Sequence, residues 1–366
     1  MRRHRVLPSR VHAVQLPRGG RFPGARRHGP RSGPGAGHEW RTALPAADRS
    51  SRRNRDRRRR PVNEPTAADN PYRRGCAWVD GEYVPVRDAK ISLLDAGFSR
   101  SDVTYDVVAV WNGKFFRLDA HLDRFEHSMK SLQMSLELDR EQIAEILTEC
   151  VRKSGLRESY VDMITTRGQP SRGSRNPWSF QNRFYAYAIP YIWIVEPDKQ
   201  EEGSHLIIAQ DTVRIPTASV DPTVKNFHWG DLTRGAFEAH ERGGSVVVLP
   251  DLDGNLTEGP GFNIFLVASG QLYTPDAGVL EGITRRTVLD LAAEQGLTTH
   301  VAPIPVADAG RADEAFMTST AGGVMPVTMI DGQPLGDGTP GPITMQLRQA
   351  YWNAHDDPRW TTPINY

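Results

Sequence analysis

Cysteine and lysine are both rare in this chain of 366 residues. The spacing of its two cysteines, Cys76 and Cys150, matches neither a disulfide framework nor a metal-ligand pattern. This argues against a cysteine-stapled secreted domain, so we expect a cytoplasmic location and no metal site. Long apolar runs are missing as well. Without about 18 consecutive apolar residues, a membrane-spanning helix is not expected.

Acidic residues are nearly missing from the first 60 positions. That stretch holds 18 arginines and three acidic residues, a balance of +15, which leaves −14 for the remainder of a chain whose total is +1. It is rich in Pro and Gly and has no apolar periodicity, so it cannot bury enough surface to offset its ordering entropy. We predict a disordered basic extension over residues 1–71. Less favoured alternatives are a nucleic-acid-binding arm and a transit peptide.

Regular patterns begin near residue 72. An alternating hairpin is predicted around Asp80-Gly81, and a basic loop rich in Gly, Ser and Pro is predicted over 168–181. Further strands are expected over 107–111, 160–166, 184–191, 205–209, 245–249 and 263–267, the last two paired around the turn 251–254. Helices are expected over 121–136, 139–153, 231–242 and 284–295. Many short strands with interspersed helices indicate an α+β protein rather than a doubly wound parallel sheet.

Among the six lysines, Lys225 stands out by its surroundings. It lies in Val-Lys-Asn-Phe-His-Trp-Gly, between an extended approach and a helix. A lysine in apolar surroundings loses its proton more readily and acts as a nucleophile or base. On this segment alone, a solvated surface lysine is the alternative.

A lone carboxylate, Glu258, follows among glycines in Thr-Glu-Gly-Pro-Gly-Phe-Asn. Glycines let a flat ligand approach the backbone closely, and a carboxylate beside a pyridine nitrogen keeps that nitrogen protonated. A solvated turn is the alternative interpretation.

Two segments are candidates for binding phosphate. Gly282-Ile-Thr284 leads into a helix, whose first N–H groups bind anions, and Thr320 belongs to a hydroxyl- and Gly-rich loop. Arg124, on the helix predicted over 121–136, would add a cation. Taken singly, each of these features is equally compatible with a helix cap or a solvated arginine.

Taken in order, these motifs resemble the fold-type IV pyridoxal-phosphate enzymes. The matching segments are Asp-Arg-Phe (123–125), Lys-Asn-Phe-His-Trp-Gly-Asp-Leu (225–232), Glu-Gly-Pro-Gly-Phe-Asn (258–263), Gly-Ile-Thr-Arg (282–285) and Thr-Ala-Gly-Gly (320–323). The resemblance covers about residues 72–366. It implies a smaller N-terminal α/β domain over 72–190, a linker over 191–197, and a larger cofactor-binding pseudo-barrel domain over 198–366. It also implies a homodimer.

The resemblance assigns a role to each of these residues. Lys225 would carry pyridoxal 5'-phosphate (PLP) through a Schiff base and move the proton. Glu258 would pair with the pyridine nitrogen. The phosphate would be held by Arg124, Ile283, Thr284 and Thr320.

The subclass depends on Ser-Asp-Val-Thr-Tyr-Asp-Val-Val-Ala (101–109), which resembles (R)-selective amine transaminases. Tyr105, Val107 and Ala109 point to one side of a strand and offer no cation for a substrate carboxylate. We predict a substrate pocket made by Arg100, Tyr105, Val107, Tyr160, Asp162, Arg172, Trp229 and Ala321, with Arg172 holding the keto acid. Two positions depart from the pattern: Arg100 replaces a usual His, and Asp106 a usual Thr.

The predicted function is therefore amino transfer from an amine, expected to be (R)-configured, to a keto acid such as pyruvate. One alternative keeps the fold and changes the reaction to that of a D-amino acid or branched-chain amino acid aminotransferase, or an aminodeoxychorismate lyase-like enzyme. Another is not enzymatic and gives the basic arm a nucleic-acid or scaffolding role.

Overall fold

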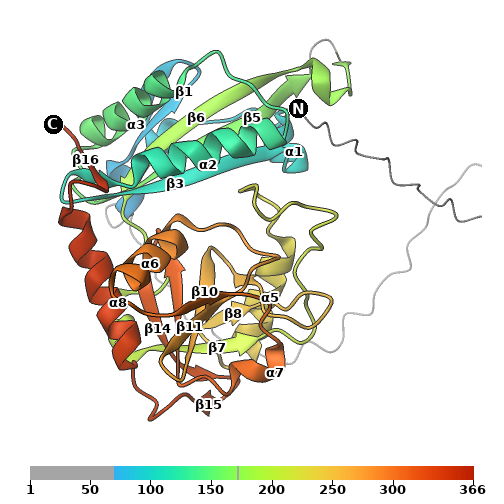
Figure 1. Ribbon diagram of the computed structural model, residues 1–366. Coiled ribbons are helices and arrows are strands. Elements are labelled where there is room, and N and C mark those ends of the chain that lie inside the picture. The colour runs from blue at the N-terminus through green and yellow to red at the C-terminus, as the bar shows by residue number, and fades with distance from the viewer. Residues whose placement is uncertain (1–69, 171–172) are drawn as a thin grey trace, which may run out of the picture. The chain divides into compact units, whose positions relative to one another are not determined.

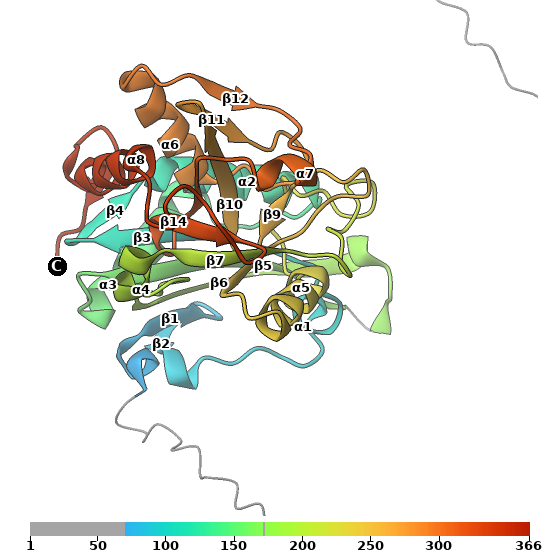
Figure 2. The same ribbon diagram turned by 90° about the horizontal axis from the view of Figure 1, so that it is seen from below.

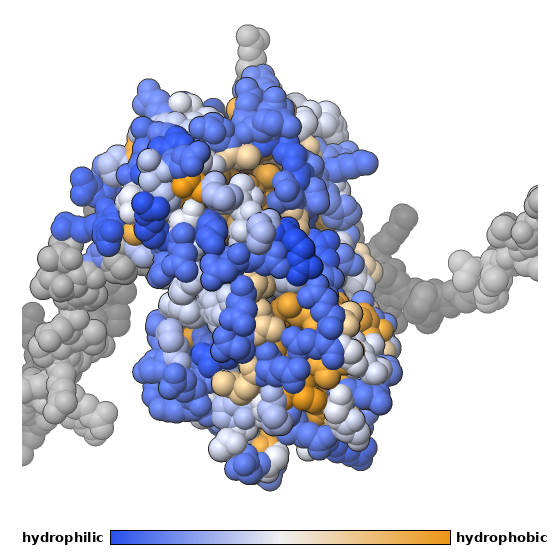
Figure 3. All heavy atoms as spheres, turned by 60° about the vertical axis from the view of Figure 1, so that its left-hand side comes forward, coloured by the Kyte–Doolittle hydropathy of each residue, from blue (hydrophilic) through white to orange (hydrophobic). Residues whose placement is uncertain are grey.

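The computed structural model describes residues 70–170 and 173–366, except for the side chains of Pro71 and Tyr72. The predicted extension therefore lies almost wholly outside the described residues, as does Arg172. Within the described part, no helix is long and apolar enough to cross a membrane. On one face, hydrophobic patches appear between hydrophilic side chains (Figure 3).

Seven strands form the first sheet, each antiparallel to its neighbours, in the order β16-β4-β3-β5-β6-β1-β2. The predicted hairpin is confirmed as β1 and β2. The predicted loop over 168–181 is shorter than expected, because β5 and β6 both extend into it. The strands are β1 (Cys76–Val79), β2 (Glu82–Pro85), β3 (Val103–Trp111), β4 (Lys114–Phe116), β5 (Ser159–Pro170), β6 (Phe180–Pro190) and β16 (Thr361–Pro363).

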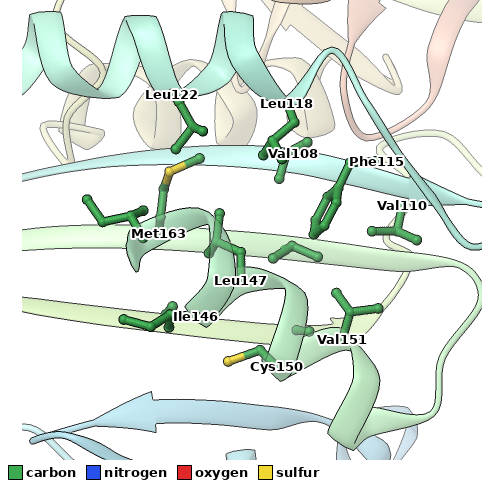
Figure 4. Packing of buried hydrophobic residues seen from close by; sticks show 14 of the residues in the cluster. Val108, Val110, Phe115, Leu118, Leu122, Ile146, Leu147, Cys150, Val151 and Met163 are labelled. Carbon is green, nitrogen blue, oxygen red and sulfur yellow. The ribbon is translucent and has the colours of Figure 1, made fainter. Parts of the chain in front are cut away.

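Helices α2 (Leu118–Ser131) and α3 (Arg140–Ser154) cover one face of this sheet (Figure 1). Figure 4 shows Val108 and Met163 of the sheet against Leu122 of α2 and Leu147 of α3. Because side chains alternate along a strand, burying Val108 directs Tyr105 and Val107 to the opposite face. One face of β3 thus builds a core and the other is free to line a site.

The second sheet has nine strands, with the path β12-β11-β10-β13-β14-β7-β8, β9 paired to β10 and β15 paired to β14. They are β7 (Ser204–Ile208), β8 (Val246–Val248), β9 (Glu258–Gly259), β10 (Phe262–Ala268), β11 (Gln271–Thr274), β12 (Thr299–Val301), β13 (Glu314–Ser319), β14 (Gly323–Ile330) and β15 (Gln333–Pro334). The remaining helices are α1 (Ala96–Arg100), α4 (Pro197–Glu202), α5 (Gly230–Glu241), α6 (Ile283–Glu294), α7 (Val306–Ala309) and α8 (Pro342–Asn353), with 3₁₀ turns η1 (Pro71–Arg74), η2 (Val86–Asp88), η4 (Pro177–Ser179) and η5 (Ala354–Asp356).

The second sheet curves until the end of β8 meets the start of β9. We call this junction, where Glu258 lies, the seam. Strand β8 ends where Leu249 N–H donates to the Glu258 carbonyl (3.1 Å), and Thr257 N–H donates to the Leu249 carbonyl (3.0 Å). Side chains from β7, β8, β10, β13 and β14 share one core inside the curl. Figure 2 shows α5 on one side of the strands and α6 with α8 on the other. The α+β fold class is confirmed.

One pairing prediction is wrong. The strands expected over 245–249 and 263–267 exist as β8 and β10, but β8 pairs in parallel with β7, and β10 pairs with β9, β11 and β13. Helix α5 connects β7 to β8, and such a crossover places two strands parallel. The domain boundaries predicted at 190 and 198 stay a prediction. Strand β16, from the end of the chain, belongs to the first sheet.

Candidate active site

A cavity of about 320 Å³ lies between the two sheets. Its wall brings together residues that are far apart in the sequence and that the motifs singled out. All six predicted cofactor-binding residues line it, as do five of the predicted substrate-pocket residues: Arg124, Lys225, Glu258, Ile283, Thr284 and Thr320, with Tyr105, Val107, Tyr160, Trp229 and Ala321.

Strand β3 holds the loop that carries Lys225. The Lys225 carbonyl accepts from the Thr104 hydroxyl (2.7 Å) and from Tyr105 N–H (3.3 Å). Its Nζ lies 4.4 Å from the centroid of the Tyr105 ring, in cation–π geometry. The first sheet therefore fixes the lysine, although the lysine belongs to the second half of the chain.

Glu258 is a buried carboxylate in the same cavity. Its Oε2 accepts from Leu280 N–H (2.8 Å), and its Oε1 accepts from the Arg214 guanidinium (3.0 Å). Burial raises the pKa of Glu258, and the charge of Arg214 opposes that rise. The arrangement suits a carboxylate that faces a cationic partner.

The N-terminus of α6 opens onto the cavity. Its N-cap, Gly282, offers no side chain to the first N–H groups of the helix, and Gly282, Ile283 and Thr284 all line the wall. A Cβ on Gly282 would meet Asn263 Oδ1 at 2.1 Å, so only glycine allows this close approach. Helix N–H groups without a cap make an anion-binding site.

Asp106 organises the cation of this anion site. Its carboxylate accepts from Arg124 Nε (2.7 Å) and Nη2 (2.8 Å), and from His121 Nδ1 (2.8 Å). The charge of Arg124 and these hydrogen bonds overcome burial and hold the pKa of Asp106 well below its usual range, while burial lowers the pKa of His121. An ionised carboxylate only accepts, so a neutral His121 donates through Nδ1. Arg124 also donates to the Glu281 carbonyl (3.1 Å).

Three predicted substrate-pocket residues do not line this cavity. Arg100 lies over the Phe180 ring (5.7 Å) and lines a second cavity of about 380 Å³ that shares Val224, Asn226 and His228 with the first. Asp162 lies behind the wall on β5, and Arg172 is outside the described residues.

Asp162 is buried and only half satisfied. Its Oδ2 accepts from the Tyr187 hydroxyl (2.9 Å), while Oδ1 finds no hydrogen-bond partner within residues 70–170 and 173–366. Burial raises the pKa of Asp162 from an ordinary 3.8 to about 8. The folded protein therefore holds a proton here, between these pH values, that the unfolded chain does not hold.

This buried acid predicts a pH-dependent stability. The pKa of Asp162 is higher in the folded protein than in the unfolded chain. Its contribution to the free energy of unfolding is therefore complete below pH 3.8 and is lost as pH rises toward 8. Asp162→Asn should remove that slope and raise the free energy of unfolding at pH 8 by on the order of 1–3 kcal/mol. Thermal unfolding from pH 5 to 9 measures it, with the exposed Asp198→Asn as control. An equal loss of stability at every pH would contradict the prediction.

Two residues of the site were missed by sequence reasoning. Asp106 was noted only as a departure from the usual pattern, and Arg214, in Val-Arg-Ile-Pro, was not noted at all. Neither has a local signal, because their partners lie 18 and 44 residues away. Only the tertiary contacts identify them: Asp106 lies against Arg124 and His121, and Arg214 lies against Glu258 and Asp231.

Comparison with known proteins gives the family. The amino-transferase class IV model matches residues 104–330. A protein of Methanocaldococcus jannaschii, provisionally named a branched-chain-amino-acid aminotransferase, is 31% identical over 276 residues, which cover 75% of this chain and 94% of that protein. The D-alanine aminotransferase of Bacillus licheniformis is 28% identical over 277 residues, 75% of this chain and 95% of that protein.

A solved structure agrees with this. A branched-chain amino acid aminotransferase (T.th.), complexed with N-(5'-phosphopyridoxyl)-L-glutamate, superimposes with a TM-score of 0.74 at 29% identity, covering 80% of this chain and 99% of that chain. The fold that the two proteins share, together with the cavity described above, defines this chain as a PLP-dependent aminotransferase of fold type IV. The chain belongs to the class IV aminotransferase family.

The residues of the cavity fit PLP. Glu258 supplies a buried carboxylate for a ring nitrogen, Lys225 an amine for an aldehyde, and the start of α6 free N–H groups for a phosphate. The hydroxyl of Thr318 is buried in the same wall and has no hydrogen-bond partner in the described part of the chain. A bound oxyanion would satisfy such a hydroxyl.

Proposed function

We propose that this aminotransferase takes its amino group from an (R)-configured amine and delivers it to a keto acid such as pyruvate. The observation that carries the proposal is that, among the described residues, both arginines of the cavity wall are already paired with carboxylates. Arg124 and Arg214 line the cavity, but Arg124 is paired with buried Asp106 and Arg214 with two buried carboxylates. Next to Lys225, the wall presents Tyr105 and Val107, which bind an apolar amine better than a carboxylate.

Lys225 performs the proton transfer in this proposal. Its amine would bind the cofactor covalently, and, once displaced by a donor, the neutral Nζ would take the proton from the α carbon of the substrate. When bound, PLP withdraws electron density from that carbon through its protonated ring. Glu258 holds the proton on the ring nitrogen. Nζ lies 4.4 Å from the centroid of the Tyr105 ring, so this ring holds it in the cavity.

The other cofactor residues bind and orient. Arg124, Ile283 N–H, Thr284 and Thr320 would hold the phosphate, and Lys225 and Glu258 would contact the rest of the cofactor. Three of the five N–H groups of Arg124 already donate to Asp106 and the Glu281 carbonyl, which leaves two for the phosphate.

Amino transfer then occurs in two half-reactions. In the first, the donor would give up its amino group to the bound cofactor and leave as a ketone after hydrolysis. In the second, the keto acid would receive that amino group and leave as an amino acid. From the resemblance, Arg172 would hold the carboxylate of the keto acid. Tyr160, Trp229 and Ala321 shape the apolar pocket around the amine, with Asp162 behind its wall.

A substrate panel tests the choice of donor. With pyruvate as acceptor, we expect alanine to form at least about tenfold faster from an (R)-arylalkylamine than from its (S)-enantiomer or from D- and L-amino acids, a difference of about 1.4 kcal/mol in activation free energy. Alanine formation measured by chromatography decides the result. Faster reaction with branched-chain or D-amino acids would replace the proposal with that alternative, and carbon–carbon cleavage would indicate a lyase.

A homodimer and a cytoplasmic location also belong to the proposal. Support for the dimer comes from the segment before α1, where Leu93 and Leu94 are 75% and 70% exposed, followed by Phe98 at 60%. Exposed apolar side chains this close together are typical of interaction sites. Arg100 lies two residues after Phe98. If its guanidinium bound a substrate carboxylate, the enzyme would prefer amino acids, which is the alternative function.

A further inference from the structure

A buried row of three charges joins α5 to the seam of the second sheet. Arg214 donates from Nη2 to Glu258 Oε1 (3.0 Å) and from Nη1 to Asp231 Oδ2 (2.6 Å). All three side chains are at most 9% exposed. The second oxygens are satisfied too, by Leu280 N–H on Glu258 and Leu232 N–H on Asp231, both at 2.8 Å. Such complete pairing is what a buried ionic group requires.

With both carboxylates ionised, the two carboxylates and one guanidinium carry a charge of −1. A protonated ring nitrogen beside Glu258 would cancel this charge. Without Arg214, two buried carboxylates would lose their common counter-ion, and one of them would take up a proton. Because Arg214 contacts Oε1 directly, its charge acts more strongly on the carboxylate than on a group beyond it.

We propose that Arg214 is a positioning residue for amino transfer, which keeps Glu258 ionised and oriented so that the ring nitrogen of PLP carries the proton. The proposal rests on the role assigned to Glu258 above. Asp231 holds the other end of Arg214 and lies in the first turn of α5, six residues after Lys225. Through Arg214, the helix that follows the lysine is therefore tied to the carboxylate.

The test replaces the guanidinium in the PLP-loaded full-length enzyme. Arg214→Met should move the proton from the ring nitrogen to Glu258. The ¹⁵N chemical shift of cofactor labelled at the ring nitrogen should then shift from the protonated toward the neutral value at pH 7.5. We expect kcat to fall roughly 10- to 100-fold with little change in KM, as for other partners that tune a reactive group. Arg214→Lys, which keeps the charge, should restore part of both readouts.

Controls separate a specific effect from loss of a buried arginine. Arg242→Met removes an arginine that also pairs with two carboxylates, Glu238 and Asp331, away from the cavity, and should leave the ¹⁵N shift unchanged. If Arg214→Met does not fold, Arg214→Gln, which keeps a donor without the charge, decides the matter. A wild-type ¹⁵N shift in the folded uncharged variant would overturn the proposal.

Glu258→Gln distinguishes the two levels of inference. If it changes the ¹⁵N shift and the uncharged Arg214 variant does not, only the role of Arg214 fails. If Glu258→Gln leaves the shift unchanged, the assignment of Glu258 fails, and the proposal for Arg214 fails with it.

Discussion

Lys225→Ala is expected to abolish amino transfer, with kcat/KM at least about 10⁴-fold lower, because one amine supplies both the covalent anchor and the proton-transfer group. The fold should be retained, since the loop is held through backbone contacts: Thr104 and Tyr105 donate to the Lys225 carbonyl. Stopped-time alanine assays measure the loss, and thermal unfolding checks the fold.

A covalent readout makes the Lys225 prediction independent of substrate. After borohydride reduction, the wild-type peptide that contains Lys225 should gain the mass of the cofactor, and the alanine variant should not. Lys199→Ala is the matched control, because Lys199 is exposed and its amine pairs with Glu202 in its own helix. Cofactor attached at another lysine, or appreciable activity in Lys225→Ala, would disprove the assignment.

Asp106→Asn is expected to cause the largest loss of stability, on the order of 3–5 kcal/mol, because it leaves the buried guanidinium of Arg124 without its counter-ion. The loss should lower the midpoint of thermal unfolding by on the order of 10 °C. The affinity for PLP should fall as well, since Arg124 loses the two bonds that orient it. Differential scanning calorimetry and PLP titration measure the two effects.

The sign of the pH dependence follows from the depressed pKa of Asp106. A lowered folded pKa stabilises the protein above the ordinary value of 3.8, and this contribution is lost as the pH falls below it. The wild type and Asp106→Asn should therefore converge in acid. Asp102→Asn is the control: Asp102 also forms a two-bond pair with an arginine, Arg167, but is 27% exposed, so about 1 kcal/mol or less is expected. Equal losses in the two variants would contradict the prediction.

Local patterns predicted half of the helices and strands that the structure describes, and they missed β13, β14 and α8 among others. The hairpin at Asp80-Gly81, helix α3 with its Asp139 cap, and α6 after Gly282 all depend on residues close in sequence. Pairing was harder to predict, because β8 and β10 flank one turn yet find other partners. The alternation of apolar residues along a strand indicates which face is buried, but it does not indicate which strand pairs with it.

By itself, the sequence determined the chemical groups of the site and their order: Lys225, Glu258, the glycine before α6, and Arg124 on an amphipathic helix. These are properties of side chains and of short segments. Only the tertiary structure decided the electrostatics, by placing Arg214 against Glu258, Asp106 against Arg124, and β3 under the lysine loop. Thr104 and Lys225 are 121 residues apart. Contacts at such separations, and the burial that strengthens them, exist only once both sheets have formed.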